Sequence, residues 1–364
     1  MLCSHCYAVN RMPGSGDLTS GGPPAPDHAA TMQDIARAAG VSQSTVSRIL
    51  NDAVTTVPIA AVTRERVLDV ANRLGYRPNP LARGLRGAKT MLLGIIVREI
   101  SDPFFAPGVE AVSTRARERN YNVVLGSAHG LADEAIELHG LLETRHCDAI
   151  IVFGDMRDQP RLLDDLAAAT VPVVALWQGT PLPGIDTVNV DNRVGVRLAV
   201  DHLVALGHRR FGFIGGGSHG DLRERRTAFV ERLGELGMPP DDAHVVPAVS
   251  DPAAGADAFG ELAATPAPPT AVVTATDLLA LGALHAAHSR GIAVPARVSV
   301  VGFDDIPLAT YTAPPLTTVH NPITEMAALA VDLAIDHEDD GARDHVLIPT
   351  FTVRASAGPV PMTD

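Results

Sequence analysis

Cysteines are few in this sequence, and it has neither a long apolar run nor a leader. Three cysteines occur among 364 residues (Cys3, Cys6 and Cys147), which argues against a disulfide framework. No apolar run reaches the ~18 residues of a membrane-spanning helix. The N-terminus lacks the basic and then apolar segments of a secretory signal. We therefore expect a soluble cytoplasmic protein without a membrane partner.

Patterns that would support catalysis or metal binding are also scarce. Cys3 and Cys6 form a C-x-x-C pair without a second ligand pair, and the 14 histidines include no H-E-x-x-H spacing. Asp304 and Asp305 are adjacent, and side chains of adjacent residues on an extended chain point in opposite directions. They are therefore not a catalytic dyad. The sequence predicts no enzyme, no catalytic residues, no metal site and no cofactor.

One stretch leaves a cofactor-binding alternative open. Residues 215–220, GGGSHG, match the G-x-G-x-x-G spacing of dinucleotide-binding loops between a strand and a helix. Asp241 and Asp242 follow about twenty residues later, where such folds place an acid on the ribose. The alternative interpretation is a glycine-rich loop that lines a cleft. The interpretation of the chain as a Rossmann dehydrogenase depends on this stretch alone.

The charge is divided unequally along the chain. The net charge is −13, yet residues 31–90 hold nine basic and four acidic residues, a net of +5 that leaves −18 elsewhere. A basic segment beside an acidic body favours phosphate binding by that segment only. The length and the 46% hydrophobic content allow a small head and two lobes. Residues 1–30, rich in Gly, Pro and Ser, are expected to be disordered.

Residues 31–51 predict two short helices joined by a turn. Thr31 and Ser42 are suited to cap them, Asp34 suits the first turn, and Gly40 separates them. Apolar residues fall on one face of each helix: Ile35, Ala36, Ala39, Val46, Ile49 and Leu50. The opposite face of the second helix carries Gln43, Ser44, Thr45, Ser47 and Arg48. This is the pattern of a helix-turn-helix whose second helix enters the major groove, although a helical hairpin with solvated polar residues has the same spacing.

A third helix is expected after a loop at residues 52–57. Its inward residues would be Val62, Val67, Val70, Ala71 and Leu74, and Gly75 would end it. Thr56 and Pro58 offer a start, because proline suits a first helical turn.

From residue 91 the pattern changes to alternating strands and helices. Strands are expected at 92–97, 121–125, 149–153, 171–176, 187–190, 211–214, 245–249, 271–274 and 298–303. Helices are expected near 105–119, 131–143, 160–169, 192–206, 221–237, 253–263, 277–290 and 323–337. Repeated β-α units predict parallel sheets covered on both faces, with ligands beyond the carboxyl ends of the strands. A last strand at 346–353 is expected near the second lobe.

The exact residues add a resemblance to this pattern. The run DIARAAGVSQSTVSRILN, and the run Gly75-Tyr76-Arg77-Pro78-Asn79 followed by Ala82 and Leu85, closely resemble LacI/GalR-family transcription regulators. The resemblance covers about residues 31–355. It implies an α + α/β chain: a helix-turn-helix head at 31–78, a hinge helix and linker at 79–90, and a two-lobed periplasmic-binding-protein-like core of doubly wound sheets at 91–358. The first lobe would hold about 91–190 and 320–343, and the second about 191–319 and 344–358.

The resemblance also implies how DNA is bound. Two copies would form a homodimer on a pseudo-palindromic operator, and Leu85 from each hinge helix, with Ala82 beside it, would enter the minor groove. Gln43, Ser44, Thr45 and Arg48 would read base edges. Backbone contacts would come from Thr31, Ser42, Ser47, Asn51, Thr63, Tyr76 and Asn79. Ala60 departs from the family, which often has a serine there that caps the third helix and touches phosphate.

A small-molecule effector is implied between the lobes. The implied contact residues are Arg98, Asp102, Phe104, Trp177, Asp191, Arg225, Thr276 and Asp304. Trp177 and Thr276 depart from the residues common in sugar-binding members. A sugar or sugar derivative is the first expectation, and an anionic metabolite or purine is the second. A stand-alone sugar-binding transport protein is a further alternative, but the basic head and the missing signal segment oppose it.

Overall fold

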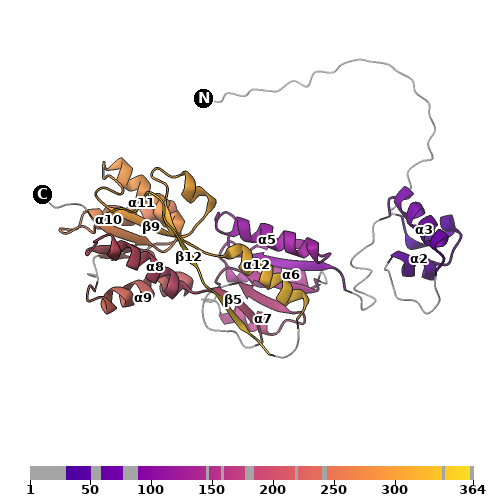
Figure 1. The fold of residues 1–364 in the computed structure, drawn as a ribbon. Coiled ribbons are helices and arrows are strands. Elements are labelled where there is room, and N and C mark those ends of the chain that lie inside the picture. Colours follow the sequence, from indigo (N-terminus) through magenta and orange to yellow (C-terminus); the bar gives the residue numbers. More distant parts are fainter. Residues whose placement is uncertain are drawn as a thin grey trace, which may run out of the picture. The chain divides into compact units, whose positions relative to one another are not determined.

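The computed structural model describes residues 30–50, 59–76, 89–144, 147–156, 160–176, 184–217, 220–239, 244–337 and 341–360 (Figure 1). The chain divides into two compact units, Met1–Asn79 and Pro80–Asp364. The first unit is called the head here and the second the core.

Three helices form the described head: α1 (Met32–Ala39), α2 (Gln43–Leu50) and α3 (Ala61–Arg73). Thr31 and Asp34 make a reciprocal capping box at the start of α1, and Gly40 ends it at φ 66°. The Ser42 hydroxyl accepts a hydrogen bond from the Thr45 amide at 3.1 Å, which caps α2. The predicted helix pair and both of its caps are confirmed.

The inner faces of the three helices pack into one cluster. Its buried members are Ile35, Ala36, Ala39, Val46, Ile49, Val67, Val70 and Ala71. Two predictions were wrong here: Val62 is 75% exposed and Leu74 is 39% exposed, so neither is a core residue. The expected start near Thr56 and Pro58 was also wrong, because α3 begins at Ala61 after an Ala60 cap without a side-chain hydrogen bond.

The first sheet of the core has the strand order β11-β5-β4-β3-β1-β2, and its strand pairings are parallel. The strands are β1 (Leu92–Val97), β2 (Asn122–Ser127), β3 (Ala149–Phe153), β4 (Val173–Leu176), β5 (Asp186–Val190) and β11 (Asp344–Leu347). Its helices are α5 (Phe105–Glu118), α6 (Ala132–Thr144), α7 (Pro160–Ala167) and α12 (Ile323–Ile335). Ile95 and Ile151 join the cluster with α5 and α12, whereas Ile96 and Ile150 join the cluster with α6 and α7. Alternate strand residues thus serve opposite faces, as expected for a sheet covered on both sides.

The second sheet has the order β12-β10-β9-β8-β6-β7, in which β12 alone is antiparallel to its neighbour. Its strands are β6 (Phe211–Ile214), β7 (Val245–Val246), β8 (Ala271–Thr274), β9 (Ser299–Asp304), β10 (Thr317–His320) and β12 (Thr350–Thr352). The helices of this lobe are α8 (Asn192–Ala205), α9 (Gly220–Glu235), α10 (Pro252–Ala263), α11 (Asp277–Ser289) and the 3₁₀ turn η2 (Pro307–Tyr311). The predicted doubly wound, two-lobed core is confirmed.

The end of the chain corrects one prediction. The stretch at 346–353 is not one strand of the second lobe: β11 extends the first sheet beside β5, and β12 pairs with β10 in the second sheet (Figure 1). The second lobe therefore does not contain all of 344–358, and the chain crosses between the sheets after Leu347. None of the described helices is long and apolar enough to span a bilayer.

Candidate functional site

The exposed face of α2 is the first candidate site. Gln43, Ser44 and Arg48 are exposed, and Thr45 and Ser47 are half-buried beside them. Among the described residues no ion pair involves Arg48. A planar guanidinium and an amide on one exposed face can donate to and accept from base edges.

Two residues predicted to contact the DNA backbone have hydroxyls that are already hydrogen-bonded within the head. The Thr31 hydroxyl donates to Asp34 at 2.6 Å, and the Ser42 hydroxyl lies 2.8 Å from those of Ser44 and Thr45. Thr63 is half-buried, and Tyr76 packs against the head cluster. Four further predicted residues lie outside the described ranges: Asn51, Asn79, Ala82 and Leu85.

The second candidate site, called the effector pocket here, is a small pocket of about 30 Å³ between the two lobes. It lies beyond the carboxyl ends of β1, β3, β4 and β5, where open parallel sheets hold ligands. The first lobe and the chain crossing contribute Arg98, Phe104, Phe105, Phe153, Gly154, Asp155, Leu176, Val190, Asn321, Ile323 and Met326, and α9 contributes Asp221 and Arg225.

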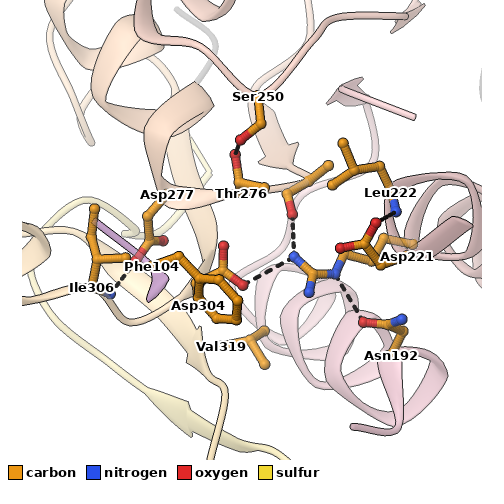
Figure 2. Close-up of polar contacts among 12 residues, drawn as sticks. Phe104, Asn192, Asp221, Leu222, Ser250, Thr276, Asp277, Asp304, Ile306 and Val319 are labelled. Atoms are coloured by element: carbon orange, nitrogen blue, oxygen red, sulfur yellow. Dashed lines mark hydrogen bonds and ion pairs between the residues drawn. The ribbon is translucent and has the colours of Figure 1, made fainter. Parts of the chain in front are cut away.

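Arg225 is the most constrained cation of this pocket. Its Nε donates to Asn192 at 2.8 Å, and its Nη1 donates to the Ala275 carbonyl at 2.6 Å and to Asp304 at 3.1 Å. Its guanidinium lies 3.7 Å from the centre of the Phe303 ring. Figure 2 shows Asp304 and Asn192 facing this guanidinium from two sides. The hydrogen bonds fix its orientation, as preorganised recognition of a polar ligand requires.

Asp304 is buried behind Arg225, and burial raises the pKa of its carboxyl to about 7; the nearby Arg225 offsets that rise only in part. Its backbone has φ 118°, and that of Asp305 has φ 56°, both unusual for residues with a side chain. The Asp305 carboxylate accepts from Arg354 at 2.6 Å and from Thr352 at 3.2 Å. The two carboxylates thus serve different partners.

The raised pKa of Asp304 predicts a pH dependence of stability. The folded state holds this proton up to about pH 7, whereas the unfolded state releases it near 3.8. The stabilisation is therefore fully present below the unfolded value and is lost as pH rises to about 7. Urea unfolding measures the free energy of unfolding at about pH 6 and about pH 8. Between these two values the free energy of unfolding should decrease less for Asp304→Asn than for the unchanged chain. Equal decreases in both would contradict this role.

The other predicted effector residues lie in different surroundings. Asp102 lines an adjoining recess of about 410 Å³, together with Arg98 and Ser250. Asp191 caps α8 by accepting from the Val194 amide at 2.9 Å. Thr276 caps α11, and its hydroxyl lies 2.9 Å from that of Ser250 (Figure 2). Asp191 and Thr276 therefore act as helix caps, and Trp177 lies outside the described residues.

Sequence reasoning missed Asp155, Asp221 and Asn321, which line this pocket, and Asn192, which accepts a hydrogen bond from Arg225. Asp155 follows β3 and accepts a hydrogen bond from the Gly220 amide at 2.5 Å, which links the first lobe to the start of α9. The position of Asp155 just after a strand could have pointed to it, because ligands lie at those strand ends. Asn321 lies where the chain passes from β10 to the first lobe, and only the structure shows that this passage borders the pocket.

The glycine-rich stretch adopts the geometry of a close-packed loop. Gly215 and Gly216 have φ 128° and 85°, and a Cβ at Gly216 would lie 2.6 Å from Arg226 Cδ. Helix α9 begins at Gly220 and contributes Asp221 and Arg225 to the effector pocket. In the described residues, no group of three or more His, Cys, Asp or Glu side chains could hold a metal ion.

A helix-turn-helix head and a two-lobed core with a polar pocket between its lobes define a class: DNA-binding regulators with a separate sensing core. The head at residues 31–79 matches the family described as bacterial regulatory proteins, lacI family, and residues 200–357 match the periplasmic binding protein-like domain.

Relatives span almost the whole chain. The HTH-type transcriptional regulator DegA of Bacillus subtilis (strain 168) is 33% identical over 337 residues, 91% of this chain and 98% of DegA. A Lac repressor dimer bound to operator and the anti-inducer ONPF is similar in structure, with a TM-score of 0.81 and 26% identity over 91% of this chain and 100% of that one. The regulator CelR in complex with cellobiose has a TM-score of 0.66 and 31% identity over 90% of this chain and 99% of that one. The chain belongs to the LacI family of transcription regulators, and its relatives are regulators rather than enzymes. The dehydrogenase interpretation is therefore wrong.

Proposed function

We propose that this chain is a repressor that binds a pseudo-palindromic operator as a homodimer and is controlled by a small molecule in the effector pocket. The observation that carries the proposal is the presence, in one chain, of an exposed polar α2 face and a polar pocket between two lobes. By linkage, the effector must bind free and operator-bound protein with affinities that differ by about 1–3 kcal/mol.

On DNA, the side chains of Gln43, Ser44, Thr45 and Arg48 would read base edges from α2. The backbone contacts assigned to Thr31 and Ser42 would come from their main chains and neighbouring amides, because their hydroxyls already serve as caps. Helix N-termini donate readily to phosphate.

The effector is proposed to be a neutral sugar or sugar derivative. The polar lining balances Arg98 and Arg225 against Asp155 and Asp221, with Asn321 as an amide. Carboxylates accept from hydroxyl groups and guanidinium groups donate to them, so this set suits several hydroxyls. A balanced lining favours a neutral polyol over an anion. The bound cellobiose of CelR supports the same class.

Asp304 and Asp305 offer a route from the pocket to the chain crossing. Asp304 holds Arg225, while the next residue holds Arg354 and lies 3.0 Å from His320 of β10. A shift of Arg225 on binding would therefore act on strands at the crossover between the lobes. Strained backbone at such a junction is consistent with a two-state element.

Selection of genomic fragments with the purified chain, at fixed moderate salt, tests the regulator. An enriched pseudo-palindrome supports it, and release of that DNA by one of a panel of neutral sugars supports the effector. If an organic anion or a purine released the DNA instead, the effector would belong to that class and not to the sugars. Failure to enrich any motif, with or without the panel, would contradict the repressor.

Arg48→Ala is expected to weaken operator binding by about 1–3 kcal/mol and to relax the preference for one base pair. The reason is that an arginine on this face can grip a guanine with two hydrogen bonds. Binding to selected and scrambled operators at equal salt measures both effects. Arg66→Ala, which removes another exposed arginine from α3, is the matched control. It should weaken binding to the selected and the scrambled operator about equally. Unchanged discrimination by Arg48→Ala would contradict a base-reading role.

A further inference from the structure

A second recess lies at the far end of the second sheet from Arg225 and belongs to neither site above. It has a volume of about 180 Å³ and is formed by the end of α10, the loop before β8 and the loop before β9. Its lining residues are Phe259, Leu262, Ala263, Pro268, Pro269, Val272, Ile292, Arg297 and Val298.

The floor of this recess is apolar and firmly held. Phe259, Leu262 and Val272 are at most 2% exposed and belong to the main cluster of the second lobe. Pro268 and Pro269 form part of the wall, and their rings fix φ, which keeps the loop in one shape. The recess is thus largely formed before any ligand binds, which lowers the entropic cost of binding.

The charge at the recess is positive. Arg297 is exposed, and it is the one charged residue among the described residues that line the recess. Arg210 lies next to the wall, because its Nε donates to the Pro268 carbonyl at 3.2 Å. A ligand with an apolar body and an anionic end would match this arrangement.

We propose that this recess binds a small organic monocarboxylate with an aromatic or short aliphatic body. The body would rest on Phe259 and Leu262, and the carboxylate would pair with Arg297, whose planar fork matches the two carboxylate oxygens. The site is independent of the effector pocket, although β9 connects their surroundings: it begins beside Val298 and ends at Asp304.

Equilibrium dialysis of the full chain with labelled benzoate tests the proposal, with benzyl alcohol as the neutral analogue of the same shape. Benzoate should bind at one saturable site, and benzyl alcohol should bind about tenfold more weakly. Arg297→Gln should lower the affinity for benzoate about tenfold and leave the affinity for benzyl alcohol almost unchanged. Arg117→Gln, which removes an exposed arginine from α5 in the other lobe, is the matched control and should change neither.

A second variant tests the apolar part of the recess. Ala263→Phe should fill the space and remove the binding of both probes, while far-ultraviolet circular dichroism shows that the chain is folded. Non-saturable benzoate binding would overturn the proposal. So would equal benzoate affinity in Arg297→Gln and the unchanged chain, or loss of binding in Arg98→Gln alone, because the last result would place benzoate in the cleft between the lobes.

Discussion

Replacing Arg225 by methionine is expected to abolish effector control and to lower the free energy of unfolding by about 3–5 kcal/mol. The guanidinium is 3% exposed and orients Asn192, the Ala275 carbonyl and Asp304 together. Methionine fills similar space but leaves Asp304, the Asn192 amide oxygen and the Ala275 carbonyl buried without the donor that they share. Urea unfolding measures the stability, and operator release by the sugar from the panel measures the control.

A second substitution separates these two effects. In the Arg225→Met, Asp304→Asn double variant the ionisable buried carboxyl is also removed, so part of the stability should return while effector control stays lost. Operator affinity without effector is measured for each variant as the baseline for its release by effector. Normal effector release from the operator in either variant would contradict the role of Arg225.

Gly282→Ala is expected to destabilise the second lobe by at least the ~1–3 kcal/mol typical of overpacking. A Cβ at this position of α11 would overlap the carbonyl oxygen of Pro252 and lie 2.7 Å from the Ala256 amide nitrogen, both in α10. Backbone atoms in a helix cannot move aside as a flexible side chain can. Thermal or urea unfolding followed by circular dichroism measures the loss.

Gly234→Ala is the matched control for this substitution. Gly234 is also helical, in α9, but nothing lies within 4 Å of its added Cβ. Alanine there should stabilise the chain by about 0.5–1 kcal/mol, because it removes backbone freedom from the unfolded state. A loss of equal size at both positions would show that close packing of α10 and α11 is not the cause.

Local patterns predicted much of the fold. The strands β1, β3, β6 and β8 have the predicted bounds, because each is a short apolar run between turn residues. The head helices follow from their caps and from Gly40. Val62 and Leu74 were misplaced because the predicted inward set was too wide for a helix that touches its two neighbours along one narrow face.

The candidate site was predicted less completely. Arg98, Phe104 and Arg225 do line the effector pocket, and Asp304 lies behind it. The family resemblance implied Asp191 and Thr276 as effector contacts, and in both cases the side chain caps the helix that follows. A short polar side chain before a helix satisfies nearby backbone amides first, and sequence alone does not say whether it also reaches a ligand.

The sequence by itself determined the helix-turn-helix, the alternation of strands and helices, and the division into a basic head and an acidic body, because these depend on spacing and composition along the chain. Only the tertiary structure decided which residues share a pocket. Asp155 meets Gly220 across the lobes, and Arg225 meets Asp304 from 79 residues away. Only the tertiary structure also shows that the chain passes from β11 in one sheet to β12 in the other. Such contacts join residues far apart in the sequence, so the packing of both sheets had to be in place before they could be identified.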